Sequence, residues 1–328
     1  MKTRTIKIGV IGGGEGATKA ISALINCKAV QINAVVCDDK ELTGLIKPAI
    51  RVSMHDLLHV CDVDAVYIAT PNNTHIDLAI DVLRAGKHVM MEKPVAVSFS
   101  EASRLISHKQ TNFSIAVAFK KRYGDWIEYF KKHMVTSRHP ITINVRWYNP
   151  APQGNWRYIY AISGGGVVMD IGSHVIDLLE VLFGQILDIE VKLKMSERFP
   201  QIDEEALIKL FFFNGHSATI ELSWLKSQSC QIYSFFSLEK EFHLKRQYDG
   251  TDLGTFKYNK ETTNISFNPS MEYVGLFTAW RDSIEKNERL VPQLDDGLRN
   301  QSIMQVIYSE CYRKPLLSQL TVARNNFN

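Results

Sequence analysis

A glycine cluster between a short apolar run and an amphipathic stretch constrains this chain more than any other feature. Residues 6–11 form a β-branched run typical of a buried parallel strand, and a helical pattern over residues 15–27 follows. Between them stands Gly12-Gly13-Gly14-Glu15-Gly16-Ala17, which fits the pattern G-x-G-x-x-A. A strand, a glycine turn and a helix in this order predict a turn that binds the pyrophosphate of a dinucleotide.

Each residue of this turn has an expected task. Gly12 makes the tight turn, Gly14 lets the backbone approach the pyrophosphate, and Ala17 is small enough for the helix to pack on the strand. The free amides at the helix start favour phosphate charge, and Gly16 lies among them. Glu15 fits less well, because its carboxylate would stand near the bound anion unless it turns away.

An acidic residue follows the second predicted strand, which covers residues 32–37. Asp38 stands 26 residues after Gly12, where a carboxylate can accept hydrogen bonds from both ribose hydroxyls. No arginine is adjacent to receive a 2′-phosphate, and Lys40 is the nearest cation. We therefore expect NAD as the cofactor, with NADP less favoured. The alternative is a glycine turn in an α/β domain that binds no nucleotide.

Strand and helix patterns alternate through the first third of the chain. Further strands are predicted at residues 65–69, 88–91 and 113–119. The helices between them carry start and stop signals, namely Ser53 with Asp56, Ser98 with Glu101, and a C-terminal Gly86. Strands separated by helices of this length predict βαβ units and a parallel sheet.

The pattern changes after about Tyr123. A strand is predicted at residues 141–147, a helix at 167–183, and four or five strands without intervening helices between 186 and 244. A last helix is predicted from about residue 296 to 312. The fold class is therefore α/β, with an N-terminal Rossmann-type parallel-sheet domain over residues 1–122. A C-terminal α+β domain with a mainly antiparallel sheet covers residues 123–328.

Composition excludes several classes of protein. The chain has 328 residues, a 45% hydrophobic share and a net charge of +3, which are ordinary for a globular protein and unlike a nucleic-acid binder. Its five cysteines form no C-x-x-C pair, which favours a reducing, cytoplasmic setting. No apolar stretch reaches 18 residues, so we expect no membrane span.

Three further segments carry a family resemblance. They are Thr70-Pro71-Asn72-Asn73-Thr74-His75, the run Glu92-Lys93-Pro94, and the stretch from Gly164-Gly165-Gly166 through Asp170, His174 and Asp177. In this order the chain resembles the Gfo/Idh/MocA family of sugar and cyclitol dehydrogenases, from Ile8 to about Tyr312. The resemblance implies hydride transfer between a nicotinamide cofactor and a hydroxyl or keto carbon of a sugar, sugar derivative or cyclitol.

The resemblance also implies roles for individual residues. Lys93, Asp170 and His174 would surround the reacting carbon. Cofactor contacts would come from Thr70, Pro71, Asn72, His75, Glu92 and Lys93, and substrate contacts from Trp156 and Arg157 with Asp170 and His174, and more weakly from Arg122 and Tyr148. The family's open sheet commonly packs against a second copy, which implies a homo-oligomer, either a dimer or a tetramer.

The chemistry explains these residue types. Loss of a hydride from an alcohol leaves a proton to remove, and histidine is a suitable base near neutral pH. Lysine can stabilise the developing alkoxide charge. Asp170 and His174 are i, i+4 neighbours at a helix start, so their side chains face one way. Either Lys93 or His174 can be the formal base.

Other interpretations compete with these. Asp170, His174 and Asp177 have spacing that could hold a metal, as do His55, His59, Cys61 and Asp62. We interpret the first set as catalytic and the second as a solvated helix face, and we expect no metal. Two other functions stay open: a reductase of a non-sugar carbonyl or dihydrodiol, and a non-catalytic NAD-sensing regulator.

Overall fold

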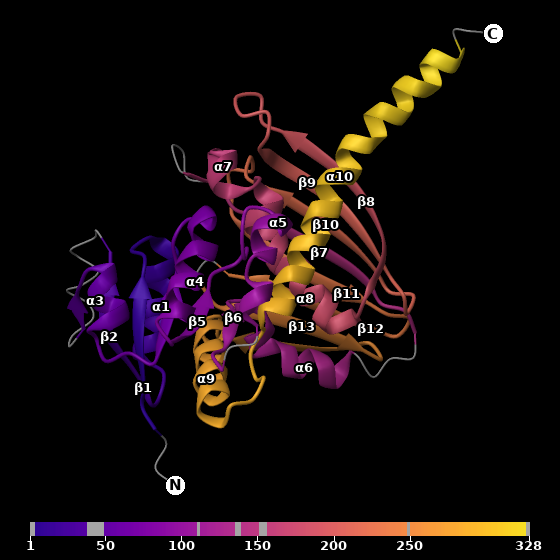
Figure 1. The fold of residues 1–328 in the computed structure, drawn as a ribbon. Helices are drawn as coiled ribbons and strands as arrows, with labels where there is room; N and C mark the ends of the chain where they lie inside the picture. Colours follow the sequence, from indigo (N-terminus) through magenta and orange to yellow (C-terminus); the bar gives the residue numbers. More distant parts are fainter. Residues whose placement is uncertain are drawn as a thin grey trace. The chain divides into compact units, whose positions relative to one another are not determined.

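The computed structural model describes residues 4–37, 49–109, 112–134, 139–150, 156–247 and 250–325 (Figure 1). The side chains of Glu15 and of residues 311–325 lie outside this description. The chain forms two compact units. Unit 1 consists of residues 1–125, 161–164 and 268–301, and unit 2 of residues 126–160, 165–267 and 302–328. Residues 268–301 thus return to the first unit, which a single division between residues 122 and 123 does not include.

Unit 1 contains a six-stranded parallel sheet in the order β3-β2-β1-β4-β5-β6. The strand order reverses between β1 and β4. Open α/β sheets bind ligands next to such a reversal, at the carboxyl ends of their strands. The expectation of a Rossmann-type parallel sheet is therefore confirmed. The strands are β1 (Ile6–Ile11), β2 (Val30–Val36), β3 (Ile50–Arg51), β4 (Ala65–Ile68), β5 (His88–Met91) and β6 (Ile115–Val117).

Helices cover both faces of this sheet. Alternate strand residues such as Ile8 and Tyr67 pack against α1 (Glu15–Ile25) and α9 (Met271–Lys286). Their neighbours, such as Val66 and Ile68, pack on the opposite face. There they meet α3 (Met54–His59), α4 (His75–Arg84), α5 (Phe99–Ser103) and the first turns of α10 (Leu294–Asn325). The apolar runs of the strands follow from this burial on both faces.

The predicted helix signals are confirmed. The Ser53 hydroxyl accepts a hydrogen bond from the Asp56 amide at 3.1 Å, and the Ser98 hydroxyl accepts from the Glu101 amide at 3.2 Å. Gly86 ends α4 with φ of +70°, a conformation that costs little only for glycine.

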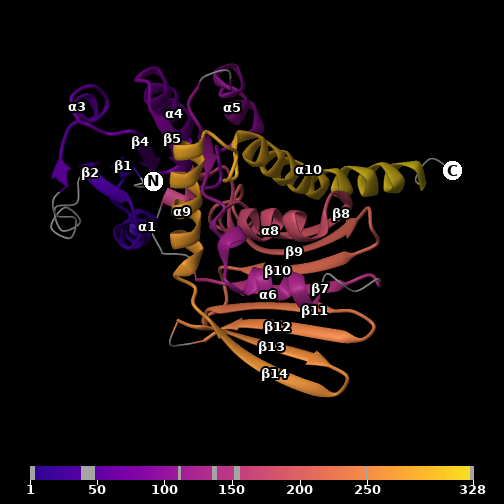
Figure 2. The same cartoon turned by 90° about the horizontal axis from the view of Figure 1, so that it is seen from below.

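Unit 2 contains an eight-stranded sheet in the order β14-β13-β12-β11-β7-β10-β9-β8, drawn edge to edge in Figure 2. It is antiparallel except between β7 and β10, whose residues pair in parallel from Thr142 with Ser217 to Tyr148 with Ser223. The expectation of a mainly antiparallel sheet is confirmed. The strands are β7 (Thr142–Tyr148), β8 (Ile186–Met195), β9 (Asp203–Phe212), β10 (Ser217–Ser223), β11 (Cys230–Phe236), β12 (Lys240–Arg246), β13 (Asp252–Tyr258) and β14 (Glu261–Phe267).

Two helices supply much of the core of unit 2. Trp126 and Phe130 of α6 (Trp126–His133) pack with Phe235 and Phe242 of the sheet, and the rings of Phe130 and Phe235 lie 4.4 Å apart. The helix α8 (Ser173–Phe183) consists mainly of apolar residues, and eight of its eleven residues are buried. Short elements complete the fold: η1 (Asn72–Thr74), η2 (Ile106–His108), η3 (Lys120–Tyr123), η4 (Trp156–Tyr158), α7 (Tyr160–Ser163) and the π-helical turn η5 (Val168–Gly172).

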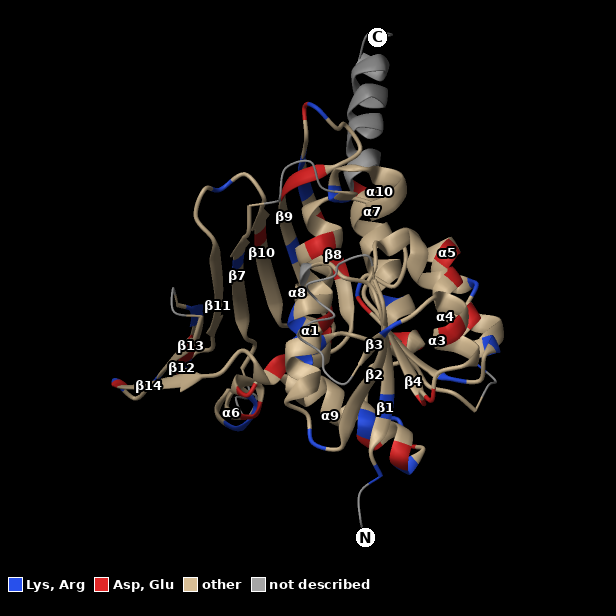
Figure 3. Ribbon diagram, turned by 90° about the vertical axis from the view of Figure 1, so that its left-hand side faces the viewer, with Lys and Arg blue, Asp and Glu red and all other residues tan. Residues whose placement is uncertain are grey.

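The distribution of charged residues in the structure agrees with the near balance of acidic and basic residues in the sequence. Basic and acidic residues are interspersed along the described parts of both units (Figure 3). Among the described residues, no helix is both long enough and apolar enough to cross a membrane.

Candidate functional site

The glycine turn of unit 1 is closed at one residue and open at two others. Gly12 has φ of +119°, and a β-carbon placed there would lie 2.1 Å from the Ala69 carbonyl oxygen. Its amide donates to the Val36 carbonyl oxygen at 2.9 Å. Among the described residues, a β-carbon at Gly14 or Gly16 would meet nothing within 4 Å. Gly12 is therefore required by the fold, whereas Gly14 and Gly16 leave open space above the backbone.

That open space lies at the start of α1. Gly14 is the N-cap residue, and it has no side chain with which to cap the first amides of the helix. Ala17 is fully buried, as close packing of helix on strand requires. An exposed backbone with uncapped amides fits the pyrophosphate of a dinucleotide. Asp38 and Lys40 lie outside the described residues.

The predicted cofactor segment after β4 forms a compact turn. The Thr74 hydroxyl donates to the Pro71 carbonyl oxygen at 2.7 Å and lies 2.6 Å from the Thr70 hydroxyl. Asn72 is buried, and its side-chain amide donates to the Ser163 carbonyl oxygen at 2.8 Å. The turn is thereby tied to the segment that leads into the glycine triplet.

His75 lies beneath this turn. Its ring is fully buried, with Nδ1 3.0 Å from the Pro94 carbonyl oxygen and Nε2 2.9 Å from the Thr70 carbonyl oxygen. Burial lowers the pKa of His75. The ring thus connects the turn after β4 to the turn after β5, and both of its nitrogens face backbone oxygens.

Glu92 and Lys93 follow β5 at the same edge of the sheet. One Glu92 oxygen, Oε1, accepts from the Tyr67 hydroxyl at 2.5 Å and from the Tyr273 hydroxyl at 2.9 Å. The other accepts from the Lys93 amide at 3.2 Å. Burial, reinforced by the Glu92 charge, raises the pKa of both tyrosines, so they stay protonated as donors. The Glu92 carboxylate is therefore fixed from both sides.

Lys120, which the sequence analysis did not single out, lies at this edge after β6. Its ammonium stands 4.0 Å from the centre of the Tyr273 ring. Burial lowers the pKa of Lys120 to about 8, while Glu272 and Glu92 oppose this effect and Lys121 and Lys93 add to it. The next residue, Lys121, instead forms a buried ion pair with Glu272 at 2.7 Å.

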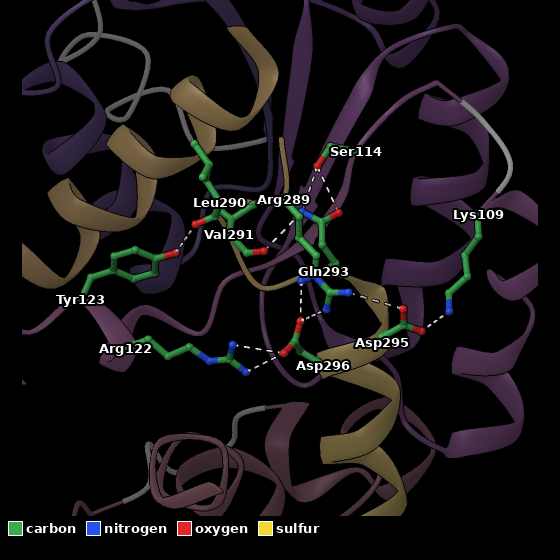
Figure 4. A network of polar contacts seen from close by, with 10 residues as sticks. All are labelled: Lys109, Ser114, Arg122, Tyr123, Arg289, Leu290, Val291, Gln293, Asp295 and Asp296. Atoms are coloured by element: carbon green, nitrogen blue, oxygen red, sulfur yellow. Dashed lines mark hydrogen bonds and ion pairs between the residues drawn. The ribbon is translucent and has the colours of Figure 1, made fainter. Parts of the chain in front are cut away.

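Arg122 takes part in a polar network within unit 1 (Figure 4). Both terminal nitrogens of its guanidinium donate to Asp296 at 3.1 Å. Asp296 also accepts from Arg289 at 2.8 Å and from the Gln293 amide at 2.8 Å. Although burial opposes it, the Arg122 charge and these donors lower the pKa of Asp296. A substrate contact by Arg122 would have to form beside this ion pair.

In unit 2, Asp170 lies in the π-helical turn η5, and His174 lies in the first turn of α8. The Asp170 carboxylate lies 3.6 Å from Nε of Arg157, whose guanidinium in turn lies 4.9 Å from the centre of the Trp156 ring. The His174 ring stacks on Trp147 at 5.9 Å with an interplanar angle of 12°. π-Helical turns are rare and occur often at functional sites. Asp170, Arg157 and Trp156 thus form one chain of contacts, and His174 with Trp147 forms a second one four residues further along.

Tyr148 ends β7, one residue after Trp147. It pairs with Ser223 of β10 and Cys230 of β11 in the sheet register. Burial, followed by a hydrogen bond to Glu221, raises the pKa of Tyr148 to about 12. Its hydroxyl can therefore donate a hydrogen bond at any physiological pH.

Two of the additional residues had a sequence signal. Lys120 directly follows a predicted strand, as Glu92 does, and Trp147 ends one. Tyr273 had no such signal, because it lies in α9, more than 140 residues beyond β5, and its partner Glu92 follows that strand. Long-range partners of this kind leave no local pattern.

Comparison with known proteins agrees with both units. Residues 6–117 match the family model described as "Oxidoreductase family, NAD-binding Rossmann fold", and residues 139–237 match the "GFO/IDH/MocA C-terminal domain". The chain is 31% identical over 191 residues to levoglucosan dehydrogenase of Pseudarthrobacter phenanthrenivorans, covering 49% of each protein. It is 28% identical over 169 residues to inositol 2-dehydrogenase of Salmonella typhimurium, covering 48% of this chain and 50% of that protein.

These alignments span about half the length of the curated relatives. Among solved structures, aldose-aldose oxidoreductase from Caulobacter crescentus, complexed with glycerol, superposes with a TM-score of 0.83 at 20% identity. That match covers 95% of this chain and 98% of the other, and at this identity it shows a shared fold. From the two family models and the fold, the chain belongs to the Gfo/Idh/MocA family of oxidoreductases with an NAD-binding Rossmann fold.

Proposed function

We propose that this protein transfers a hydride between NAD and a hydroxyl or keto carbon of a sugar, sugar derivative or cyclitol. The observation that carries the proposal is the open glycine turn, where Gly14 and Gly16 expose uncapped amides at the start of α1. The names of the relatives, levoglucosan dehydrogenase and inositol 2-dehydrogenase, support the substrate class.

The residues at the carboxyl edge of the parallel sheet would hold the cofactor. The bound nicotinamide supplies hydride acceptor and donor chemistry. The amides from Gly14 to Ala17 would bind the pyrophosphate. The turn of Thr70, Pro71 and Asn72 would lie beside the ribose on the nicotinamide side of the cofactor. Glu92, fixed by Tyr67 and Tyr273, keeps lone pairs that could accept a ribose hydroxyl. His75 would act indirectly, by holding the two turns.

Lys93, Asp170 and His174 would handle the proton. The Lys93 ammonium would donate to the substrate oxygen and stabilise its charge as the hydride leaves. His174 would accept or supply the proton, with its ring plane set by Trp147. Asp170, paired with Arg157, would orient the imidazole or bind a second hydroxyl. Trp156 and Arg157 would line the substrate side, together with Tyr148 and, beside its ion pair, Arg122.

We further propose that NAD is preferred to NADP, because Asp38 would accept from both ribose hydroxyls and repel a 2′-phosphate. A division at residues 122 and 123 between a cofactor domain and a substrate domain remains a prediction. So do a cytoplasmic location and a homo-oligomer formed through the sheet of unit 2.

The first test is a parallel titration of the protein with NADH and NADPH, followed by nicotinamide fluorescence. We expect tighter binding of NADH. Tighter binding of NADPH would contradict the role of Asp38, and binding of neither would contradict the oxidoreductase proposal itself.

The second test is a screen of polyols, aldoses and cyclitols with NAD, on the wild type and on Lys93→Ala and His174→Ala. Each variant should lose about a thousandfold in kcat while keeping its NADH affinity, since general acid–base and electrostatic groups contribute on this scale. NADH binding without turnover of any member of the panel would favour the alternative function, a non-catalytic NAD-sensing regulator. Wild-type turnover by either variant would remove that residue from the mechanism.

A further inference from the structure

A buried carboxylate outside the predicted site holds the turn that leads to Asp170 and His174. Asp203 begins β9 and is fully buried. Its Oδ1 accepts from the Gly166 amide at 2.6 Å and from the Tyr308 hydroxyl of α10 at 2.8 Å. Its Oδ2 accepts from the Val168 amide at 2.8 Å. Both oxygens of the carboxylate are thus engaged.

The packing around this carboxylate is as tight as its hydrogen bonding. A β-carbon at Gly166 would lie 1.9 Å from the Asp203 carbonyl oxygen. Gly165 has φ of +155°, and a β-carbon there would lie 2.1 Å from the Tyr308 hydroxyl. These two glycines are therefore required because the turn lies directly against Asp203 and Tyr308.

The turn is joined to the proposed catalytic residues through the backbone. The Gly166 carbonyl oxygen accepts from the Asp170 amide at 3.0 Å, while the Gly166 amide donates to Asp203. Val168 is the first residue of η5, which ends where α8 begins, one residue before His174. Two amides at the start of this segment would lack an acceptor inside the protein if the carboxylate were absent.

We propose that Asp203 is a positioning residue, whose carboxylate fixes the start of η5 and thereby sets how Asp170 and His174 are presented. Its effect on turnover rests on the proposed function. The anchoring of the segment does not, and it can be measured without a substrate.

Electrostatics show that an ionised Asp203 has a cost to the fold. Burial raises the pKa of Asp203 to about 6, although the two amides and Tyr308 oppose this change. Tyr308, whose own pKa is raised by burial and by Asp203, is the titratable side chain that hydrogen-bonds it in the described structure. A neutral side chain would avoid the cost of burying a charge at this position. The amides of Gly166 and Val168, however, each need an acceptor, and the two oxygens of a carboxylate supply both.

The test compares Asp203→Asn with a matched control, Asp252→Asn. Asp252 is also buried in unit 2, begins a strand, and pairs with Arg246 away from η5. Asparagine at 203 has one acceptor oxygen, so one of the two amides is left facing a donor. Amide hydrogen exchange at 166–174 should therefore accelerate at least about tenfold in Asp203→Asn, and should not do so in Asp252→Asn.

Turnover provides the second measurement. With any substrate found in the screen, Asp203→Asn should lower kcat by about ten- to a hundredfold with NADH affinity unchanged, because small misplacements of catalytic groups have effects of this size. Tyr308→Phe, which removes a single donor, should lower it less.

The outcomes separate the two proposals. Unchanged exchange at 166–174 in Asp203→Asn would overturn the inference whatever the activity, and so would faster exchange with wild-type kcat. Faster local exchange in a protein that shows no NAD-dependent turnover would support the anchoring and would count against the proposed function instead.

Discussion

Lys120 and Asp203 are charged side chains at places where burial disfavours their charge. The pKa of the Lys120 amine is lowered to about 8 and that of the Asp203 carboxyl is raised to about 6. Each shift means that the charged form is less favourable in the folded protein than in the unfolded chain. Groups held in this way are frequent at functional sites; the charges of Glu92 and Lys93 act on Lys120, and Asp203 binds the start of the segment that carries Asp170.

Replacing Lys120 tests whether its charge has a cost. The lowered pKa contributes stability that is present above the unfolded value near 10.5 and is lost as the pH falls through about 8. We therefore expect Lys120→Met to raise the free energy of unfolding at pH 7 by about 1–3 kcal/mol. Urea unfolding at pH 7, 8 and 9 should show this gain shrinking as the pH rises.

The neighbouring residue supplies a control of opposite sign. Lys121→Met leaves Glu272 buried without its cation and should destabilise the protein by about 3–5 kcal/mol. If Lys120→Met destabilises the protein to a similar extent, the Lys120 side chain supports the fold, and the prediction that its charge has a cost is wrong.

Asp203 should show the reverse dependence on pH. Its raised pKa contributes stability that is fully present below the unfolded value near 3.8 and is lost as the pH rises through about 6. The difference in unfolding free energy between wild type and Asp203→Asn should therefore change by up to about 3 kcal/mol between pH 4 and pH 7, in favour of the variant at pH 7. A pH-independent difference, measured by urea unfolding, would contradict this assignment.

At the residue scale, sequence reasoning found the groups with a motif around them. The motifs around Lys93, Asp170 and His174 led to the family, which the comparisons show. Asp203, Tyr308 and Tyr273 have no such signal, because each acts through contacts with residues more than 30 positions away. A buried acceptor for two amides is visible only once the chain is folded.

At the element scale, the glycine turn separates the needs of folding from those of binding. Gly12→Ala places a β-carbon against the Ala69 carbonyl oxygen in a backbone conformation that alanine rarely adopts. We expect it to lose at least about 2 kcal/mol of stability.

Gly14→Ala is the matched variant for binding. Gly14 has φ of −75°, which alanine accepts, and the added methyl meets no atom of the described residues within 4 Å. We expect near wild-type thermal stability and NADH binding weakened by about tenfold, which corresponds to about 1.4 kcal/mol. Equal NADH affinity in Gly14→Ala and wild type would mean that the pyrophosphate does not lie over this residue.

Secondary structure was most predictable where burial on both faces produces apolar runs, as in β1 and β4. The strands β13 and β14 were not predicted, because β14 is largely exposed and carries polar residues at most positions. The parallel pairing of β7 with β10 was not predicted either, since β8 and β9 intervene in the sequence. The helix α9 was not predicted either, although its buried residues Tyr273, Leu276, Phe277 and Trp280 follow helical spacing.

At the scale of the whole molecule, unit 1 is assembled from segments far apart in the chain. The side chains of Tyr273, Leu276, Phe277 and Trp280 cover one face of its parallel sheet. A fragment ending at residue 125 retains every strand of that sheet but lacks this cover. We expect the fragment to be unfolded or aggregated, because a chain that exposes a large apolar face tends to aggregate.

Backbone amide NMR of the fragment would test this expectation. A well-dispersed spectrum and a cooperative thermal transition would show that the strands and α1 suffice for a stable unit. Addition of a peptide covering residues 268–301 should restore dispersion if the missing cover is the cause.

The chain passes between the two units repeatedly, near residues 125, 160, 164, 267 and 301. A cut between residues 122 and 123 would therefore separate residues 268–301 from the compact unit to which they belong, and a gene fusion at that point could not exchange one unit for another. Proteins that descend from such a chain would change their substrates mainly by point substitutions and by changes within loops. The two units would be inherited together.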